Sequence, residues 1–248
     1  MNEYNKTQLN PDKAFERHVF HRDQFAHYLR WCHLLKNMKI GYNVLDFGCG
    51  IKGNAAEVLY RNKYKANNYL GLDIRDLKNA EEKFKNVKWA SFEQLDLVKS
   101  DMISIGNNWD IIISFEVIEH VGKQNAKTFL ENIKKCMNKN TLLLLSTPNF
   151  DENVGAVKNH IINGIVGEFK FNELKDLLEN YFEIIDVFGT FSSQKDYKNS
   201  LNDWQLKTFN KLKKYYDSNL VSNLMAPIIK PEHARNCVWQ LKLKKVIK

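Results

Sequence analysis

Residues 43–53 read NVLDFGCGIKG, a short apolar run that leads directly into a glycine-rich turn. The run 43–47 predicts a buried strand, and residues 55–61, which follow the turn, predict a helix. Glycines allow the backbone to turn tightly and to approach a ligand closely. The helix that follows offers backbone N–H groups at its N-terminus, where a nucleotide-like ligand can bind. The segment therefore predicts the first strand, turn and helix of a ligand-binding parallel sheet.

Strands and helices are expected to alternate along the rest of the chain. Further apolar runs predict strands at 68–74, 87–92, 109–115, 141–146, 182–188 and 237–243. Helices are predicted at 13–37, 78–85, 124–138 and 171–180. Such alternation predicts an α/β fold, with a doubly wound, Rossmann-like, seven-stranded sheet covered by helices on both faces. The sheet is expected to be mostly parallel, with an antiparallel last strand.

The chain has 248 residues, enough for one large domain with a sizeable core. We expect an N-terminal helical cap at 1–40, followed by a Rossmann-like domain at 41–248. The Lys-rich stretch between the last two predicted strands has a helical pattern. We therefore expect a helical insert at about 192–233 within this domain.

The composition is that of a folded protein, because 44% of the residues are hydrophobic and 27% are charged. No apolar run approaches the length of about 18 residues that a membrane-spanning helix needs. The first residues also lack the apolar segment of a secretory signal. The four cysteines (Cys32, Cys49, Cys136 and Cys237) are scattered, without the paired spacing of a zinc site. These features predict a cytoplasmic protein without a membrane span.

The net charge of +8 is concentrated at the two ends of the chain. Residues 201–248 carry 10 basic and 3 acidic side chains, and residues 1–40 carry 7 and 4. Basic ends can attract a phosphate-bearing partner such as a nucleic acid. The alternative is a solvated helix face, because Lys outnumbers Arg and Arg is the more specific phosphate ligand.

Two kinds of cofactor fit the glycine-rich turn. Gly48-x-Gly50-x-x-Gly53 is the fingerprint of dinucleotide-binding sites, which would make the protein a nicotinamide-dependent oxidoreductase. However, Asp46 stands two positions before the first glycine, and a carboxylate there suits a ligand that carries an ammonium group. Asp73 ends the second predicted strand, where an acidic side chain can accept hydrogen bonds from ribose hydroxyls.

Several segments together resemble class I S-adenosylmethionine-dependent methyltransferases. VLDFGCG, GLD, FEQLDL, WDIIISFEVIEHV and LLLLSTPN occur in the order and spacing of that family. The resemblance covers roughly residues 41–190. One difference is that many members have a third glycine at the position of Lys52, whereas here it comes one residue later, at Gly53.

The resemblance implies a role for each matching position. Asp46, Gly48 and Gly50 would surround the amino acid end of S-adenosylmethionine, and Asp73 would bind its ribose hydroxyls. Four further residues would complete the cofactor site. Asp96 and the backbone of Leu97 would meet the adenine, and Phe115 and Glu116 would close the site after the fourth strand.

Glu116, Glu119 and His120 follow the fourth predicted strand in the segment EVIEH. If a helix starts there, positions i, i+3 and i+4 share one face. His120, with Glu119, could then remove a proton from a hydroxyl or amine. Alternatively, the same side chains with His160 could bind a divalent cation such as Mg²⁺ or Mn²⁺. A third possibility is a helix N-terminus stabilised by acidic residues.

EVIEH, then STPN, then a later histidine resemble two subgroups of the family. One contains the ubiquinone-biosynthesis type O-methyltransferases and their small-molecule relatives. The other contains the small-RNA 3′-terminal 2′-O-methyltransferases, in which a similar set of two Glu and two His binds a divalent metal. The resemblance thus implies an enzyme, with acceptors of either kind.

Four of the seven histidines lie between residues 18 and 33. On one continuous helix, His18, His21 and His33 fall within an arc that also holds Phe25 and Leu29. Such a helix can line a substrate cleft, or it can be a packed helix whose histidines are satisfied.

Taken together, the sequence predicts a methyltransferase that transfers a methyl group to an oxygen or nitrogen of a small-molecule acceptor. The alternative is a nucleic-acid acceptor, either a terminal ribose hydroxyl or a modified base, with the basic ends as its binding surface. A protein that binds the cofactor without catalysis remains a third hypothesis.

Overall fold

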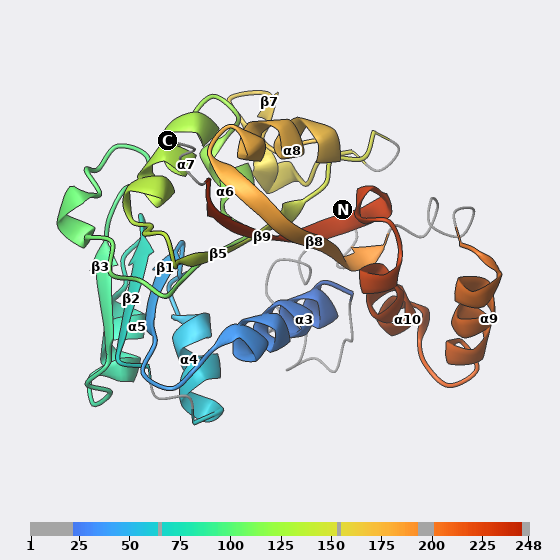
Figure 1. Ribbon diagram of the computed structural model, residues 1–248, viewed down its shortest axis with the longest axis horizontal. Coiled ribbons are helices and arrows are strands. Elements are labelled where there is room, and N and C mark those ends of the chain that lie inside the picture. Colours follow the sequence, from blue (N-terminus) through green and yellow to red (C-terminus); the bar gives the residue numbers. More distant parts are fainter. Residues whose placement is uncertain (1–21, 64–65, 153–154, 193–200, 245–248) are drawn as a thin grey trace. The chain divides into compact units, whose positions relative to one another are not determined.

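The computed structural model describes residues 22–63, 66–152, 155–192 and 201–244 (Figure 1). The helices are α3 (Arg22–Asn37), α4 (Asn54–Arg61), α5 (Lys78–Phe84), α6 (Ile118–Val121), α7 (Ala126–Lys135), α8 (Phe171–Glu179), α9 (Asp203–Leu212) and α10 (Ser218–Met225). The strands are β1 (Asn43–Phe47), β2 (Asn68–Asp73), β3 (Ala90–Gln94), β4 (Ile111–Phe115), β5 (Leu142–Pro148), β6 (Ile161–Ile162), β7 (Ile165–Val166), β8 (Phe182–Ser192) and β9 (Ala234–Leu243). The predicted alternation of strands and helices is confirmed.

The main sheet has seven strands in the order β3-β2-β1-β4-β5-β9-β8. Strands β3, β2, β1, β4 and β5 pair in parallel with their neighbours. The sheet is mostly parallel with one antiparallel strand, so the predicted Rossmann-like class is confirmed. The order reverses at β1, which places β2 and β4 on either side of the strand that leads into the glycine-rich turn.

The third strand was predicted at 87–92 but runs from Ala90 to Gln94. The apolar side chains of Val87 and Trp89 pack on the core while their backbone forms the turn after α5. The prediction placed the strand too early because buried turn residues have the same apolar character as strand residues.

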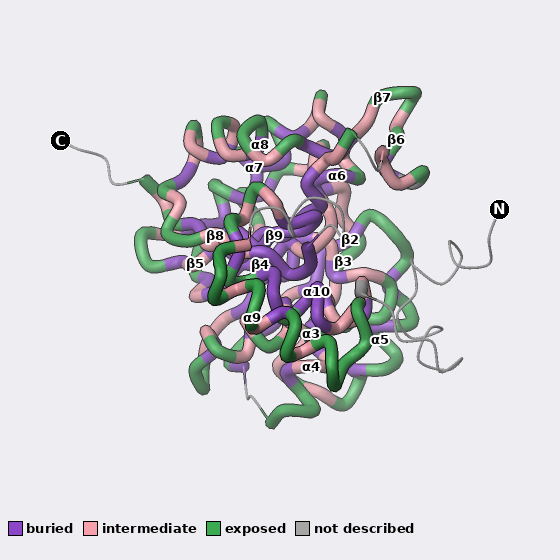
Figure 2. Tube along the Cα trace, turned by 90° about the vertical axis from the view of Figure 1, so that its right-hand side faces the viewer, coloured by how far each residue is buried: buried purple, intermediate pink, exposed green. Residues whose placement is uncertain are grey.

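Helices pack on both faces of the sheet. On one face, residues of α3, α4 and α5 join the strand residues Val44, Tyr69 and Ile113 in one buried cluster. On the other face, the ring of Phe47 meets that of Phe129 from α7 edge to face, and Phe171 of α8 stacks on Trp239 of β9. Figure 2 shows strand β4 as buried along the tube, in agreement with its residue burial. Parallel strands buried in this way need the near-continuous apolar runs that the sequence shows.

The contacts divide the chain into two compact units. The larger unit contains residues 33–187 and 239–248, and with them most of the sheet. The smaller unit includes residues 188–238, where α9 and α10 pack through Phe209, Val221 and Met225. Among the described residues, no helix has the length and apolar character needed to cross a membrane.

Candidate active site

The glycine-rich turn is built from residues in the left-handed region. Gly48, Gly50 and Gly53 have φ angles of 94°, 73° and 60°. The backbone N–H groups of Gly48 and Cys49 donate to the carbonyl of Leu72, which ties the turn to the end of β2. Non-glycine residues adopt such backbone angles only at a cost in conformational energy. The backbone angles therefore explain why glycine stands at these three positions.

Gly48 also lies against the segment that follows β4. A Cβ atom at Gly48 would be 2.3 Å from Cγ2 of Val117, which is too close for any side chain. The glycine-rich turn and the residues after β4 are therefore in direct contact. Two parts of the sequence that were predicted to form one site are brought together at this point.

Asp73 lies at the end of β2 and is almost fully buried. The backbone N–H of Gly50 donates to its Oδ2 at 2.9 Å. Arg75 Nε donates to Oδ1 at 2.8 Å, and Arg75 Nη2 donates to Oδ2 at 2.8 Å. Burial acts to raise the pKa of Asp73, but the hydrogen bonds from Arg75 and Gly50 outweigh it and lower the pKa. The carboxylate is thus held charged beside the turn, as the predicted ribose-binding role would require.

Asp46 is the buried carboxylate on β1. Its main partner is Tyr69 on the neighbouring strand, whose hydroxyl donates to Asp46 Oδ2 at 2.6 Å. Burial raises the pKa of Asp46 to about 7, the tyrosine hydrogen bond opposes this shift, and the charge of Asp73 adds to it. A cationic group beside Asp46 would favour its charged form, which is the property expected of a site for an ammonium group.

The predicted adenine-binding residues follow β3. Asp96 Oδ1 accepts hydrogen bonds from the backbone N–H groups of Val98 and Lys99 at 2.9 and 3.0 Å. Leu97 is buried and its carbonyl accepts from Asn132 of α7. Asp96 therefore organises its own turn, and the fixed backbone at Leu97 is compatible with the predicted contact.

Glu116 does not share a helical face with Glu119 and His120, because α6 begins only at Ile118. Glu116 lies before the helix with a φ of 60°, and its Oε1 accepts from the hydroxyl of Ser146 at 2.7 Å. Phe115, the last residue of β4, is half-buried beside it. The assumption of one helix through Glu116 was wrong because the backbone turns at that residue.

Glu119, His120 and His160 form a cluster of possible ligands. One side-chain oxygen or nitrogen atom from each lies within 4.8 Å of the others. The rings of His120 and His160 meet edge to face with centroids 4.7 Å apart. Glu119 is fully buried and accepts from the Thr147 hydroxyl at 2.9 Å, whereas His120 is exposed. Glu116 is not in this cluster, so three of the four predicted metal ligands are brought together.

A two-stranded hairpin, β6–β7, positions His160 and introduces a residue that the sequence analysis did not select. Glu168 is fully buried, and its Oε1 lies 2.7 Å from His160 Nδ1 and accepts from the Val157 backbone N–H at 2.9 Å. The backbone N–H of Gly167 donates to the carbonyl of His160 at 2.6 Å. A carboxylate paired with one ring nitrogen fixes the orientation of an imidazole and leaves the other nitrogen for the site.

The local sequence contained a signal for this hairpin. Asn163-Gly164 separates two pairs of β-branched residues, and both turn residues have positive φ angles of 51° and 79°. An Asn-Gly pair between apolar residues is a strong indication of a tight hairpin. The hairpin would have placed Glu168 beside His160. By contrast, no pattern in the sequence indicates Tyr69 or Arg75 as partners of the predicted cofactor residues.

The N-terminal histidines are described only in part. His18 and His21 lie outside the described residues. His27 Nδ1 is 2.9 Å from Arg30, and His33 Nε2 is 3.2 Å from Asn37, so both described rings have partners on their own helix.

Comparison with known proteins identifies the family of the chain. Residues 15–218 match the profile of the family described as "Methyltransferase domain". Among solved structures, one from Haloferax volcanii, a complex of the Trm112 methyltransferase activator with a methyltransferase, has a TM-score of 0.62. Its identity is 12%, over 99% of this chain and 98% of that one. The 1,6-didemethyltoxoflavin N1-methyltransferase of Burkholderia thailandensis, solved with S-adenosylhomocysteine, has a TM-score of 0.58 and 14% identity, over 89% and 79%.

A third structure, the N-methyltransferase NodS of Bradyrhizobium japonicum with S-adenosylhomocysteine, has a TM-score of 0.55 and 11% identity, over 89% and 88%. These identities show a common fold and no more. A search of curated proteins gives no match. The family match covers most of the chain, so this protein belongs to the methyltransferase-domain family. It is an enzyme of the class I, S-adenosylmethionine-dependent methyltransferases.

Proposed function

We propose that this enzyme transfers a methyl group to an oxygen of a small-molecule acceptor, with His120 as the general base; a nitrogen acceptor is the alternative. The observation that carries the proposal is the cluster of exposed His120 with buried Glu119 and His160, close to the glycine-rich turn. Methyl transfer mainly requires the protein to position two reactants and to accept one proton. A hydroxyl acceptor needs that proton removed, which matches an exposed imidazole that lies close to a buried carboxylate.

We assign the cofactor to the glycine-rich turn, which contacts Val117 through Gly48. Asp46 would face the ammonium group, Gly48 and Gly50 would allow close approach of the amino acid end, and Asp73 would bind the ribose hydroxyls. Asp96, Leu97, Phe115 and Glu116 would complete the site around the adenine and sulfonium. The contact between Gly48 and Val117 supports this arrangement, because Val117 precedes Glu119 by only two residues in the chain and the turn therefore lies near the cluster.

The same cluster is also a candidate site for a divalent cation. Ligand atoms around one ion lie at most about 4.4 Å apart when each bond is about 2.2 Å, so atoms within 4.8 Å fit after small side-chain movements. Two imidazoles and one carboxylate favour a transition metal such as Mn²⁺ over Mg²⁺. When bound, such an ion would lower the pKa of an acceptor hydroxyl. Glu119, His120 and His160 would hold it, with Glu168 orienting His160.

Calorimetry and a turnover assay separate these proposals. In calorimetry, S-adenosylhomocysteine should bind equally to the wild type and to His120→Ala. In an assay of S-adenosylhomocysteine release over a panel of hydroxyl, amine and RNA acceptors, His120→Ala should lose about 10²–10⁴-fold in turnover. Equal turnover would remove His120 from the mechanism. Activity confined to RNA would replace the small-molecule acceptor by the nucleic-acid one.

A direct titration with Mn²⁺ and Mg²⁺ tests the cation site. Binding that is lost in Glu119→Gln and kept in Glu116→Gln would support a metal held by the cluster, since Glu116 lies outside it. No binding of either ion would leave His120 acting as a base without a metal.

We also propose a cytoplasmic location, because all four cysteines are free thiols and three are buried, as in reducing compartments.

A further inference from the structure

Helix α9 and the turn that follows it carry a row of exposed lysine and aromatic side chains that the methyl-transfer site does not use. Trp204, Lys207, Lys211 and Tyr215 follow one another at spacings of three, four and four residues. Backbone hydrogen bonds continue the helical path past Leu212, because Tyr215 N donates to its carbonyl. Residues at these spacings lie on one face of a helix. All four are exposed, so we call them the α9 row.

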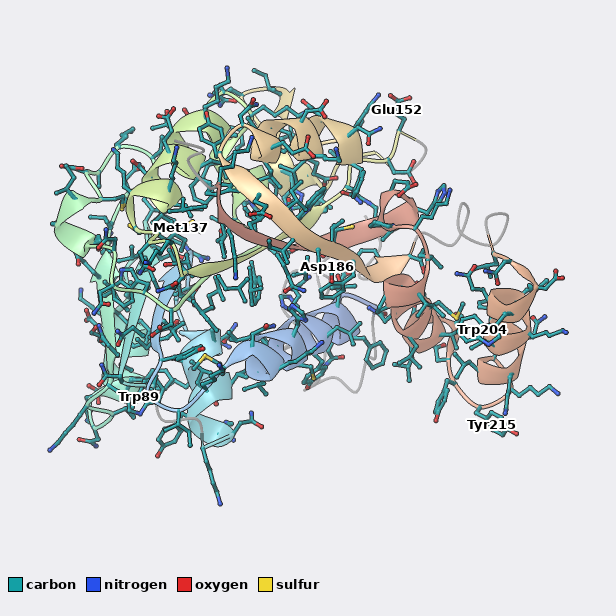
Figure 3. All side chains as sticks on the ribbon, viewed as in Figure 1. Trp89, Met137, Glu152, Asp186, Trp204 and Tyr215 are labelled. Atoms are coloured by element: carbon teal, nitrogen blue, oxygen red, sulfur yellow. The ribbon has the colours of Figure 1, made fainter. Side chains whose placement is uncertain are left out.

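The opposite face of α9 is already occupied within the smaller unit. Phe209 is buried against α10, together with Leu212, and Gln205 donates to the backbone of Ile228. The helix therefore does not need the α9 row for its own packing. Trp204 and Tyr215 are nevertheless 62% and 73% exposed, a high value for side chains of this size. Figure 3 shows Trp204 beside α9 and Tyr215 beyond its C-terminal end.

The stretch that contains the α9 row has a net positive charge. Lys213 and Lys214 add to Lys207 and Lys211, while Asp203 and Asp217 are the acidic residues of the same stretch, 201–217. Helix α10, which follows, contains no charged residue. Two aromatic rings with lysines between them thus lie along about 16 Å of helical surface.

We propose that the α9 row binds single-stranded nucleic acid. Lysines attract the phosphates, and exposed aromatic rings provide faces on which unpaired bases stack. The row contains no arginine, asparagine or glutamine that could read the edges of bases in a duplex groove, so binding should be largely independent of base sequence. A membrane surface fits less well, because lysines separate the two rings and the apolar face of α9 is buried. This proposal does not depend on the acceptor proposed above.

Binding to fluorescent oligonucleotides of about ten nucleotides, oligo(dT) and oligo(U), tests the proposal by anisotropy. The full chain should bind both, and binding should weaken with salt. Each lysine that contacts a phosphate contributes about 0.7 to the logarithmic salt slope for a single strand, so Lys207→Ala/Lys211→Ala should reduce the slope by about 1.4. Lys134→Ala/Lys139→Ala removes the same charge from exposed positions in the larger unit and should leave the slope unchanged.

The contribution of the aromatic side chains to binding is tested separately. Trp204→Ala should weaken binding about tenfold, Trp204→Phe should restore most of the loss, and a duplex of the same length should bind more weakly than the single strand. Absence of oligonucleotide binding, or equal effects of the two double-lysine variants, would overturn the proposal. Equal binding of duplex and single strand would also overturn it, because stacking would then play no part. Failure of methyl transfer to RNA would not affect it.

Discussion

Glu168 Oε1 lies 2.7 Å from His160 Nδ1, and both side chains are buried. A charged carboxylate can only accept in this pair, so it favours the tautomer with the proton on Nδ1, which leaves Nε2 available to the cluster. The two residues stand at either end of the β6–β7 hairpin. The orientation of His160 toward Glu119 and His120 therefore depends on that hairpin and on one buried carboxylate.

Replacing Glu168 by Gln should lower turnover about 10–100-fold, because an amide no longer fixes the protonation and orientation of the imidazole. Cofactor affinity should stay the same, since Glu168 is not among the predicted cofactor residues. Steady-state kinetics and calorimetry with S-adenosylhomocysteine measure the two effects. Glu152→Gln, at an exposed position paired with Lys170, is the matched control. Unchanged kcat in Glu168→Gln would show that His160 does not need its partner.

Asp73→Ala should weaken the binding of S-adenosylhomocysteine by about 1–3 kcal/mol, the cost of hydrogen bonds left unmade in a buried site. Asp76→Ala changes a nearby exposed carboxylate and should have no such effect. Calorimetry on both variants checks the ribose assignment, which would be wrong if their affinities were equal.

Arg75→Ala should strengthen cofactor binding, because the Arg75 guanidinium contacts both oxygens of Asp73 that the ribose would use. The Arg75 side chain is exposed over more than half its surface, and exposed ion pairs contribute at most about 1 kcal/mol. The gain in affinity should therefore stay within that limit. Weaker binding in Arg75→Ala would mean that the arginine itself contacts the cofactor.

Cofactor affinity should depend on pH through Asp46. Burial is the largest cause of the shift, and the Tyr69 hydrogen bond opposes it. The pKa of this carboxyl is about 7, compared with an ordinary value of 3.8. In the unliganded enzyme Asp46 is thus protonated below pH 7, and an ammonium group binds its charged form. Affinity for S-adenosylhomocysteine should fall about fivefold between pH 7 and pH 6 and level off above pH 8.

Two variants test the origin of that pH dependence. Asp46→Asn should bind weakly at every pH, with no transition near 7. Tyr69→Phe removes the hydrogen bond that lowers the pKa of Asp46, so its transition should move to higher pH. A transition that stays at the same pH in both variants would belong to another group.

Gly48→Ala should destabilise the protein by about 1–3 kcal/mol and abolish cofactor binding. The new Cβ atom would combine an unfavourable φ of +94° with a contact of 2.3 Å to Val117. Gly41→Ala is the matched control, because Gly41 has a similar φ of +86° but open space around it. Thermal unfolding should show a smaller loss for Gly41→Ala, and the difference measures the contact with Val117.

The sequence determined the class of fold and supplied the candidate residues of the cofactor site. Periodic apolar runs located the strands, and Gly48, Gly50 and Asp73 were selected as candidates because a tight turn and a strand end impose strict local requirements. Such requirements act over a few neighbouring residues, so they can be read along the chain. The third strand was predicted too early in the chain because apolar character alone does not distinguish a buried turn from a strand.

Only the tertiary structure decided which side chains meet. Tyr69 reaches Asp46 through the pairing of β1 with β2, and Glu119 joins His160 across 41 residues of chain. Glu116 leaves the cluster because its backbone turns before α6 begins. Contacts of this kind depend on the packing of distant segments. The free energy of that packing cannot be read from the order of residues along a short stretch of chain. The sequence thus supplied the candidates, and the fold selected among them.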